Sequence, residues 1–163
     1  MTLATTLNVL HILTGFLLVS GVVGRGVALR EAARARDIRA VDALVGLAGR
    51  FEVMVRVPSV AVLVLGLLTA WRGGWPILGF LQGGSANWIL VSLILYLSLV
   101  PLILWVFLPR GRKFERALAN ALAEGRVTAD LTAAFADPVV AAGHAWELIV
   151  IVLLIVLMVT KPF

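Results

Sequence analysis

Four long apolar segments constrain this chain more than any other feature of its sequence. A helix rises about 1.5 Å per residue and the hydrocarbon core of a bilayer is about 30 Å thick, so a crossing needs about 20 apolar residues. The segments that meet this requirement cover residues 4–24, 53–71, 88–108 and 138–160. They predict an all-α fold, a polytopic membrane protein in which four transmembrane helices form a single bundle over residues 1–163.

Proline, glycine and capping residues mark the ends of these segments. Residues 73–109 hold no charge, which is too long a stretch for one helix, so we expect an apolar, glycine-rich loop before the third span. Pro101 is expected to kink that span. Asp137 followed by Pro138 is typical of a helix start and predicts where the fourth span begins. No Lys or Arg precedes the first span, so we interpret it as a mature helix rather than a secretory signal.

Two charged connectors join the spans, at residues 30–50 and 110–137. Both are predicted to be short and helical, and within the second the stretch from Lys113 to Glu124 is typical of a surface helix that stops at Gly125. The same composition allows the connectors to be extensions of the membrane helices. Nothing in them predicts a separate soluble domain.

The distribution of Lys and Arg predicts the orientation. Residues 25–56 hold seven of these side chains and residues 110–126 hold five, whereas the other side of the predicted membrane has only Arg72 and Lys161. Under the positive-inside rule both connectors face the cytoplasm of a bacterial cell, and both termini lie outside the cytoplasmic membrane. The formal charge of +5 then indicates contact with anionic lipids, and nucleic acid is not an expected partner.

Ionisable side chains inside a membrane are costly and are therefore candidates for function. In this chain they are few: His11, Arg25, Glu52, Arg56, His144 and Glu147. His11 shares a helix face with Gly15 and Arg25, and an imidazole beside a glycine could ligate a metal or a haem whose edge fits against the glycine. The alternative is a neutral histidine bonded to a neighbouring helix.

The other four ionisable residues form a predicted polar membrane cluster near the cytoplasmic side: Glu52, Arg56, His144 and Glu147. Glu52 and Arg56 are spaced i, i+4 on the second span, and His144 and Glu147 are spaced i, i+3 on the fourth. Such a cluster could relay a proton or bind an anionic headgroup. The favoured interpretation is a set of ion pairs that fixes the register of the helices.

Other chemistries lack the residues that they need. A haem held by both histidines is disfavoured because His11 and His144 are expected to differ in depth by roughly 10 Å. The chain has no cysteine nucleophile, no phosphate-binding glycine loop and too few histidines for a catalytic zinc. Glycines of the first two spans, including Gly21 and Gly66, are expected to allow close helix packing.

Several short motifs resemble those of a known family. They are "LHILTGFLLVSG" around His11, "RVPSVAVLVLGL" from Arg56 to Leu67, Trp88 at the start of the third span, and the closing "LMVTKPF". Together they resemble an uncharacterised family of predicted bacterial integral membrane proteins, which is similar to the HemJ-type protoporphyrinogen oxidases and more distantly to CopD-like membrane proteins. This resemblance implies a haem b site with His11 as axial ligand, and oxidation of protoporphyrinogen.

One position departs from the HemJ-like pattern. Those proteins carry a lysine four residues after the tryptophan of the third span, where this chain has Ser92. A serine supplies no positive charge and is a poor ligand for iron, so the departure argues against the enzymatic role.

These observations rank the possible functions. The first is a non-catalytic membrane protein, an accessory or assembly component that packs against other membrane subunits, a second copy of itself or lipids. The second is a protein that binds haem b or a porphyrin through His11. A transporter ranks third, because no inverted repeat is evident.

Overall fold

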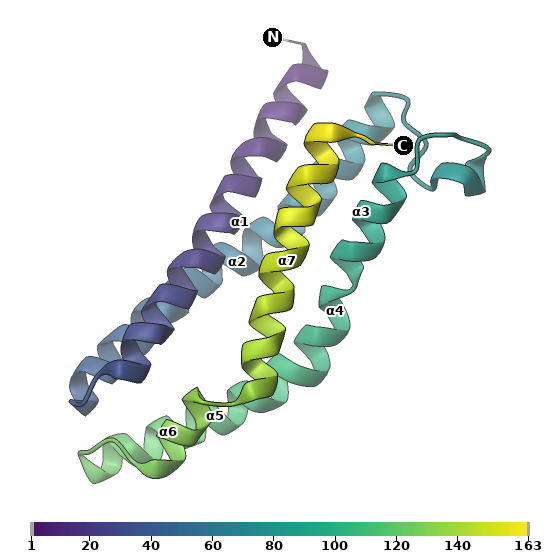
Figure 1. Ribbon diagram of the computed structural model, residues 1–163. Helices are drawn as coiled ribbons and strands as arrows, with labels where there is room; N and C mark the ends of the chain where they lie inside the picture. Colours follow the sequence, from purple (N-terminus) through teal and green to yellow (C-terminus); the bar gives the residue numbers. More distant parts are fainter. Residues whose placement is uncertain (1, 163) are drawn as a thin grey trace.

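The computed structural model describes residues 2–162, and all regular secondary structure in that range is helical (Figure 1). The elements in chain order are α1 (Leu3–Arg34), α2 (Ile38–Arg72), the 3₁₀ helix η1 (Gly79–Gln82), α3 (Trp88–Leu97), α4 (Leu99–Leu102), the π-helix η2 (Ile103–Phe107), α5 (Leu108–Glu124), α6 (Ala129–Phe135) and α7 (Pro138–Thr160). Four helical segments are long and apolar enough to cross a membrane, as the hydropathy pattern predicted.

The two ends of the molecule differ in character. Both chain ends and the loop between α2 and α3 lie together at one end, which we call the loop end (Figure 1). The turn between α1 and α2, the far part of α5, and α6 lie at the opposite end. We call this the basic end and define it as residues 25–56 and 108–137, which hold most of the Lys and Arg side chains.

α1 and α2 form a long antiparallel hairpin with a turn of only three residues. The side chain of Asp37 caps α2 by accepting from the amide of Ala40 at 3.2 Å. At about 1.5 Å per residue each helix is about 50 Å long, so both extend well beyond a hydrocarbon core of about 30 Å. Residues 30–50 are therefore mainly extensions of the first two membrane helices, one of the two arrangements that the sequence allowed.

Two glycines of α1 bring the hairpin helices close together. A Cβ atom built at Gly21 would lie 2.9 Å from the carbonyl carbon of Met54, and one at Gly24 would lie 2.5 Å from the ring of Phe51. Both distances are shorter than van der Waals contact. Small residues at these positions are what allow the two backbones to pack, since lipid supplies no hydrophobic force between helices.

The third span is an interrupted helix, as Pro101 predicted. α3 ends at Leu97, and the path continues through α4 and the π-helical turn η2 into α5. Proline cannot donate a backbone hydrogen bond, which accounts for the break in the regular α-helical pattern. Ser98 at the break accepts a hydrogen bond from the indole of Trp146 on α7 at 3.2 Å, so a neighbouring helix contacts this irregular turn.

The compact hydrophobic core lies at the basic end and outside the predicted spans. Phe114 and Phe135 pack edge to face there, with ring centroids 4.9 Å apart. The buried members of this core come from four helices: Ala32, Ile38, Val41, Ala121 and Leu131. α5 ends at Glu124 and is capped by Gly125, whose φ of 69° is readily adopted only by glycine. The connectors are thus helical, and they fold together at this end instead of lying as separate pieces.

Candidate functional site

A cluster of charged side chains connects three helices near the basic end, and Arg25 is its centre. Arg25 lies on α1 and is only 9% exposed. One of its guanidinium nitrogens donates to Glu52 of α2 at 2.6 Å, and the other donates to Glu147 of α7. One side chain therefore holds carboxylates from two other helices.

The remaining predicted members lie around this centre. Arg56 donates from Nε to the second oxygen of Glu52 at 3.0 Å. The Nδ1 atom of His144 lies 3.3 Å from Glu147 and 3.4 Å from Arg25, and its ring stacks on Phe107 with centroids 4.7 Å apart. All four residues of the predicted polar membrane cluster are thus in one place.

The charges of this cluster compensate one another. Two arginines face two glutamates, and His144 is the additional titratable group. Burying a charge without a partner is very costly, so each carboxylate is expected to need its arginine. The arrangement is well suited to fix the relative positions of α1, α2 and α7.

Arg25 is the member of the charged cluster whose contacts the sequence did not predict. The sequence identifies Arg25 as an ionisable group of the first span, but no spacing on that helix predicts its partners. Its partners lie 27 and 122 residues away in the sequence. Spacing along one helix cannot detect such pairs; the available signal is that Arg25 is the first charge after 24 uncharged positions.

His11 lies elsewhere, between α1, α2 and α7 towards the loop end. Its Nδ1 atom is 3.0 Å from the carbonyl oxygen of Val62. A carbonyl oxygen only accepts, so Nδ1 carries a proton, and in the neutral form of the ring Nε2 then carries a lone pair. Nε2 lies 3.5 Å from the thioether sulfur of Met158. Like the carbonyl oxygen, this sulfur has no proton to donate.

Gly66 lies against the ring of His11, whereas Gly15 has open space beside it. A Cβ atom at Gly66 of α2 would lie 2.9 Å from Cε1 of the imidazole, so this glycine makes room for the ring. A Cβ atom at Gly15 would meet no other atom within 4 Å, so the space beside that glycine is open. The role of Gly15 beside a cofactor remains a prediction.

The two histidines are far apart along the helices. Met158, which is level with His11, follows His144 by 14 positions on α7, and this corresponds to about 21 Å. The separation exceeds the roughly 10 Å expected from the sequence and precludes one iron between the two rings. Within residues 2–162 no group of three or more His, Asp and Glu side chains could hold a metal ion.

Two of the sequence motifs meet at the loop end. The ammonium of Lys161 lies 5.3 Å from the ring centre of Trp75 and 5.6 Å from that of Trp88, distances typical of cation–π contacts. Ser92 is buried and donates to the carbonyl oxygen of Trp88 at 2.8 Å. Phe163, the last residue of the closing motif, lies outside the described residues.

Comparison with known proteins places this architecture in a family. The chain matches the family described as "Predicted integral membrane protein (DUF2269)" over residues 5–162. No curated protein and no solved structure matches the chain. The match covers nearly the whole sequence and all four candidate membrane helices. The chain therefore belongs to the DUF2269 family of predicted integral membrane proteins.

Proposed function

We propose that this protein is a non-catalytic component of the bacterial cytoplasmic membrane that packs against other membrane subunits or lipids. The observation that carries the proposal is the pairing within the charged cluster. Arg25 of α1 bonds to both Glu52 of α2 and Glu147 of α7, and so joins three helices. Side chains engaged in this way hold a scaffold together, and they leave no obvious acid, base or nucleophile free to act on a substrate.

The outer face of α1 supports a packing role. Leu10, Leu13, Phe16 and Leu17 are 45–67% exposed and lie on one side of the helix. In a membrane such a face contacts either lipid chains or an apolar helix of another subunit. α1 packs on α2 through His11, Gly21 and Gly24, so the opposite face of α1 is available to a partner.

Native electrophoresis after gentle solubilisation tests the packing role. We expect the protein to migrate in a complex larger than a homodimer, because the face at Phe16 is covered by another subunit. Phe16→Ala is expected to weaken this complex. Trp105→Ala removes an aromatic side chain that is 75% exposed on the third span, and it serves as the matched control. Migration only as a protomer or homodimer in several detergents would contradict the proposal.

A second candidate function is binding of haem b or a porphyrin, as in the HemJ-type proteins that the motifs resemble. The observation in its favour is the lone pair of His11 Nε2 facing the sulfur of Met158, since His and Met are both axial ligands of haem iron. The donor atoms fit, but their spacing of 3.5 Å does not. Axial ligands lie on opposite sides of the iron, so two bonds of about 2 Å each require about 4 Å or more between the two ligand atoms.

The absorption spectrum separates the two candidates. We expect protein purified in mild detergent, from cells supplied with haem precursors, to show no stoichiometric Soret band. A strong band that is lost in His11→Ala would reverse the ranking. Met158→Leu is the companion variant, because loss of the band there as well would identify the sulfur as the second ligand.

A further inference from the structure

A pocket of about 390 Å³ lies at the basic end, between α5, α6 and the start of α7. Its polar lining comes from six side chains: Arg110, Lys113, Arg116, Asn120, Asp130 and Asp137. The pocket is separate from the charged cluster around Arg25, and none of its lining residues belongs to that cluster.

The depth of the pocket follows from the helices that form it. The third predicted span ends at Leu108, where α5 begins, and the fourth begins at Pro138, the first residue of α7. Arg110 and Asp137 therefore lie directly outside the hydrocarbon core, and Lys113 and Arg116 lie about one and two turns further out. This is the layer that phospholipid headgroups occupy.

One ion pair in the pocket is already complete. Arg110 donates to Asp137 at 2.9 Å, and Asp137 also accepts from the amides of Val139 at 2.9 Å and Val140 at 3.3 Å. These contacts join α5 to the start of α7. Asp137 and Arg110 are therefore each paired with an opposite charge.

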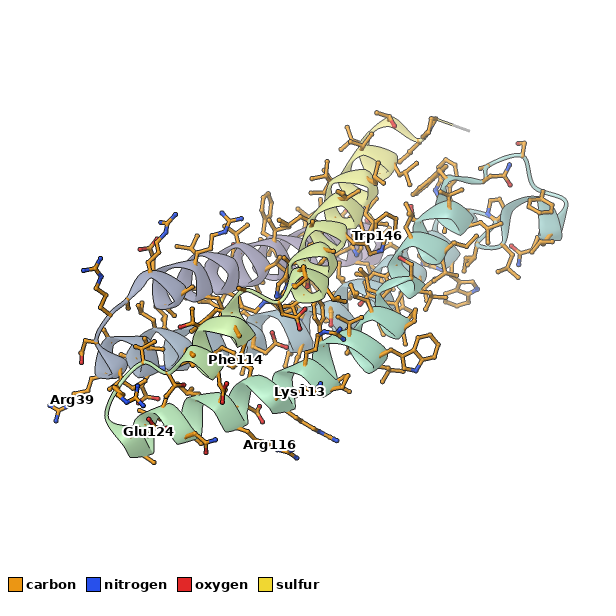
Figure 2. The ribbon with its side chains drawn as sticks, turned by 60° about the horizontal axis from the view of Figure 1, so that its bottom comes forward. Arg39, Lys113, Phe114, Arg116, Glu124 and Trp146 are labelled. Atoms are coloured by element: carbon orange, nitrogen blue, oxygen red, sulfur yellow. The ribbon has the colours of Figure 1, made fainter. Side chains whose placement is uncertain are left out.

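Two other cationic side chains line the pocket, those of Lys113 and Arg116. Neither forms an ion pair with any residue between 2 and 162, and both are exposed. They are spaced i, i+3 on α5, which places them on the same side of that helix (both are labelled in Figure 2). Two unpaired cations in a pocket at headgroup level are suited to a phosphate group.

We propose that this pocket binds the headgroup of an anionic glycerophospholipid of the phosphatidylglycerol type. Lys113 and Arg116 contact its phosphate, and Asp130 and Asn120 accept hydrogen bonds from the glycerol hydroxyls. With Arg110 and Asp137 neutralising each other, two cations face one carboxylate, so the pocket carries one net positive charge. This charge matches a lipid with a single negative charge and disfavours the zwitterionic ethanolamine lipids.

A lipid can occupy this pocket whether or not the protein joins a larger assembly, so lipid binding is independent of the proposed function. Native electrophoresis reports on protein partners and lipid binding reports on the pocket, so either idea can fail alone.

Native mass spectrometry of the chain, titrated with phosphatidylglycerol or phosphatidylethanolamine, tests the proposal. We expect one tightly bound phosphatidylglycerol per chain and weaker binding of phosphatidylethanolamine. The double variant Lys113→Gln, Arg116→Gln is expected to bind phosphatidylglycerol on the order of 25-fold more weakly, at about fivefold for each charge removed. Asp130→Asn is expected to reduce the preference for phosphatidylglycerol over phosphatidic acid, which lacks the glycerol headgroup.

Arg112→Gln is the matched control, because Arg112 lies on the same helix but does not line the pocket. We expect this variant to bind like the wild type, and we expect inorganic phosphate at millimolar concentration not to displace the lipid. Equal weakening in Arg112→Gln would overturn the proposal, as would unchanged binding in the double variant. Displacement by inorganic phosphate would show that the site takes a free anion instead of a lipid. Circular dichroism and thermal unfolding verify that each variant is folded.

Discussion

Arg25→Met destabilises the folded protein by about 3–5 kcal/mol, the expected cost of removing one partner from a buried group of charges. The substitution keeps the bulk of the side chain and removes the cation that bonds Glu52 and Glu147. Both carboxylates then lie near one another without Arg25, and only Glu52 retains an arginine partner. The free energy of unfolding in mixed micelles, from titration with a denaturing detergent, measures the effect.

The matched control for this substitution is Arg30→Met. Arg30 lies on the same helix and is exposed, so its replacement is expected to change the free energy of unfolding by less than about 1 kcal/mol. Combining Arg25→Met with Glu147→Gln is expected to recover part of the loss, because one of the unpaired charges is then absent. Equal effects at positions 25 and 30 would show that the cluster does not hold the helices together.

Gly21→Ala is expected to destabilise the hairpin of α1 and α2 by about 1–3 kcal/mol, the usual cost of overpacking. The new methyl group would lie 2.9 Å from the carbonyl carbon of Met54. A backbone atom cannot move aside as the end of a flexible side chain can, so the helices must separate. Thermal unfolding in detergent, followed by circular dichroism, measures the loss.

Gly26→Ala tests whether this effect comes from the contact or from the loss of a glycine. A Cβ atom at Gly26 would meet no other atom within 4 Å, although the residue lies on the same helix. Alanine favours a helix over glycine, so we expect Gly26→Ala to be neutral or to stabilise by about 0.5 kcal/mol. If both variants lost the same stability, close packing at Gly21 would not be the cause.

The parts of the fold that the sequence predicted are those controlled by local chemistry. Apolar length identified the four crossings, Asp137 identified the start of α7, and Gly125 identified the end of α5. The true ends of α1 and α2 were harder to predict. Charged residues end an apolar run without ending a helix, because Arg and Ala favour helix in water as well.

In the candidate site as well, the sequence predicted the contacts within one helix but not those between distant helices. Spacing of three or four residues predicted the pairs of Glu52 with Arg56 and of His144 with Glu147, since such neighbours share a helix face. The contacts of Arg25, and the position of Met158 beside His11, depend on how distant helices pack. A single sequence holds no periodic signal for contacts of that kind.

Cysteine accessibility tests the central claim most directly, namely that the chain crosses the membrane four times with its basic end in the cytoplasm. The protein has no cysteine, so each introduced thiol can be labelled alone. We predict that a membrane-impermeant maleimide added to intact cells reacts with Ser85→Cys in the loop between α2 and α3. Arg39→Cys and Glu124→Cys at the basic end should react only after the cells are opened. Labelling of either basic-end position in intact cells, or protection of position 85, would contradict this account.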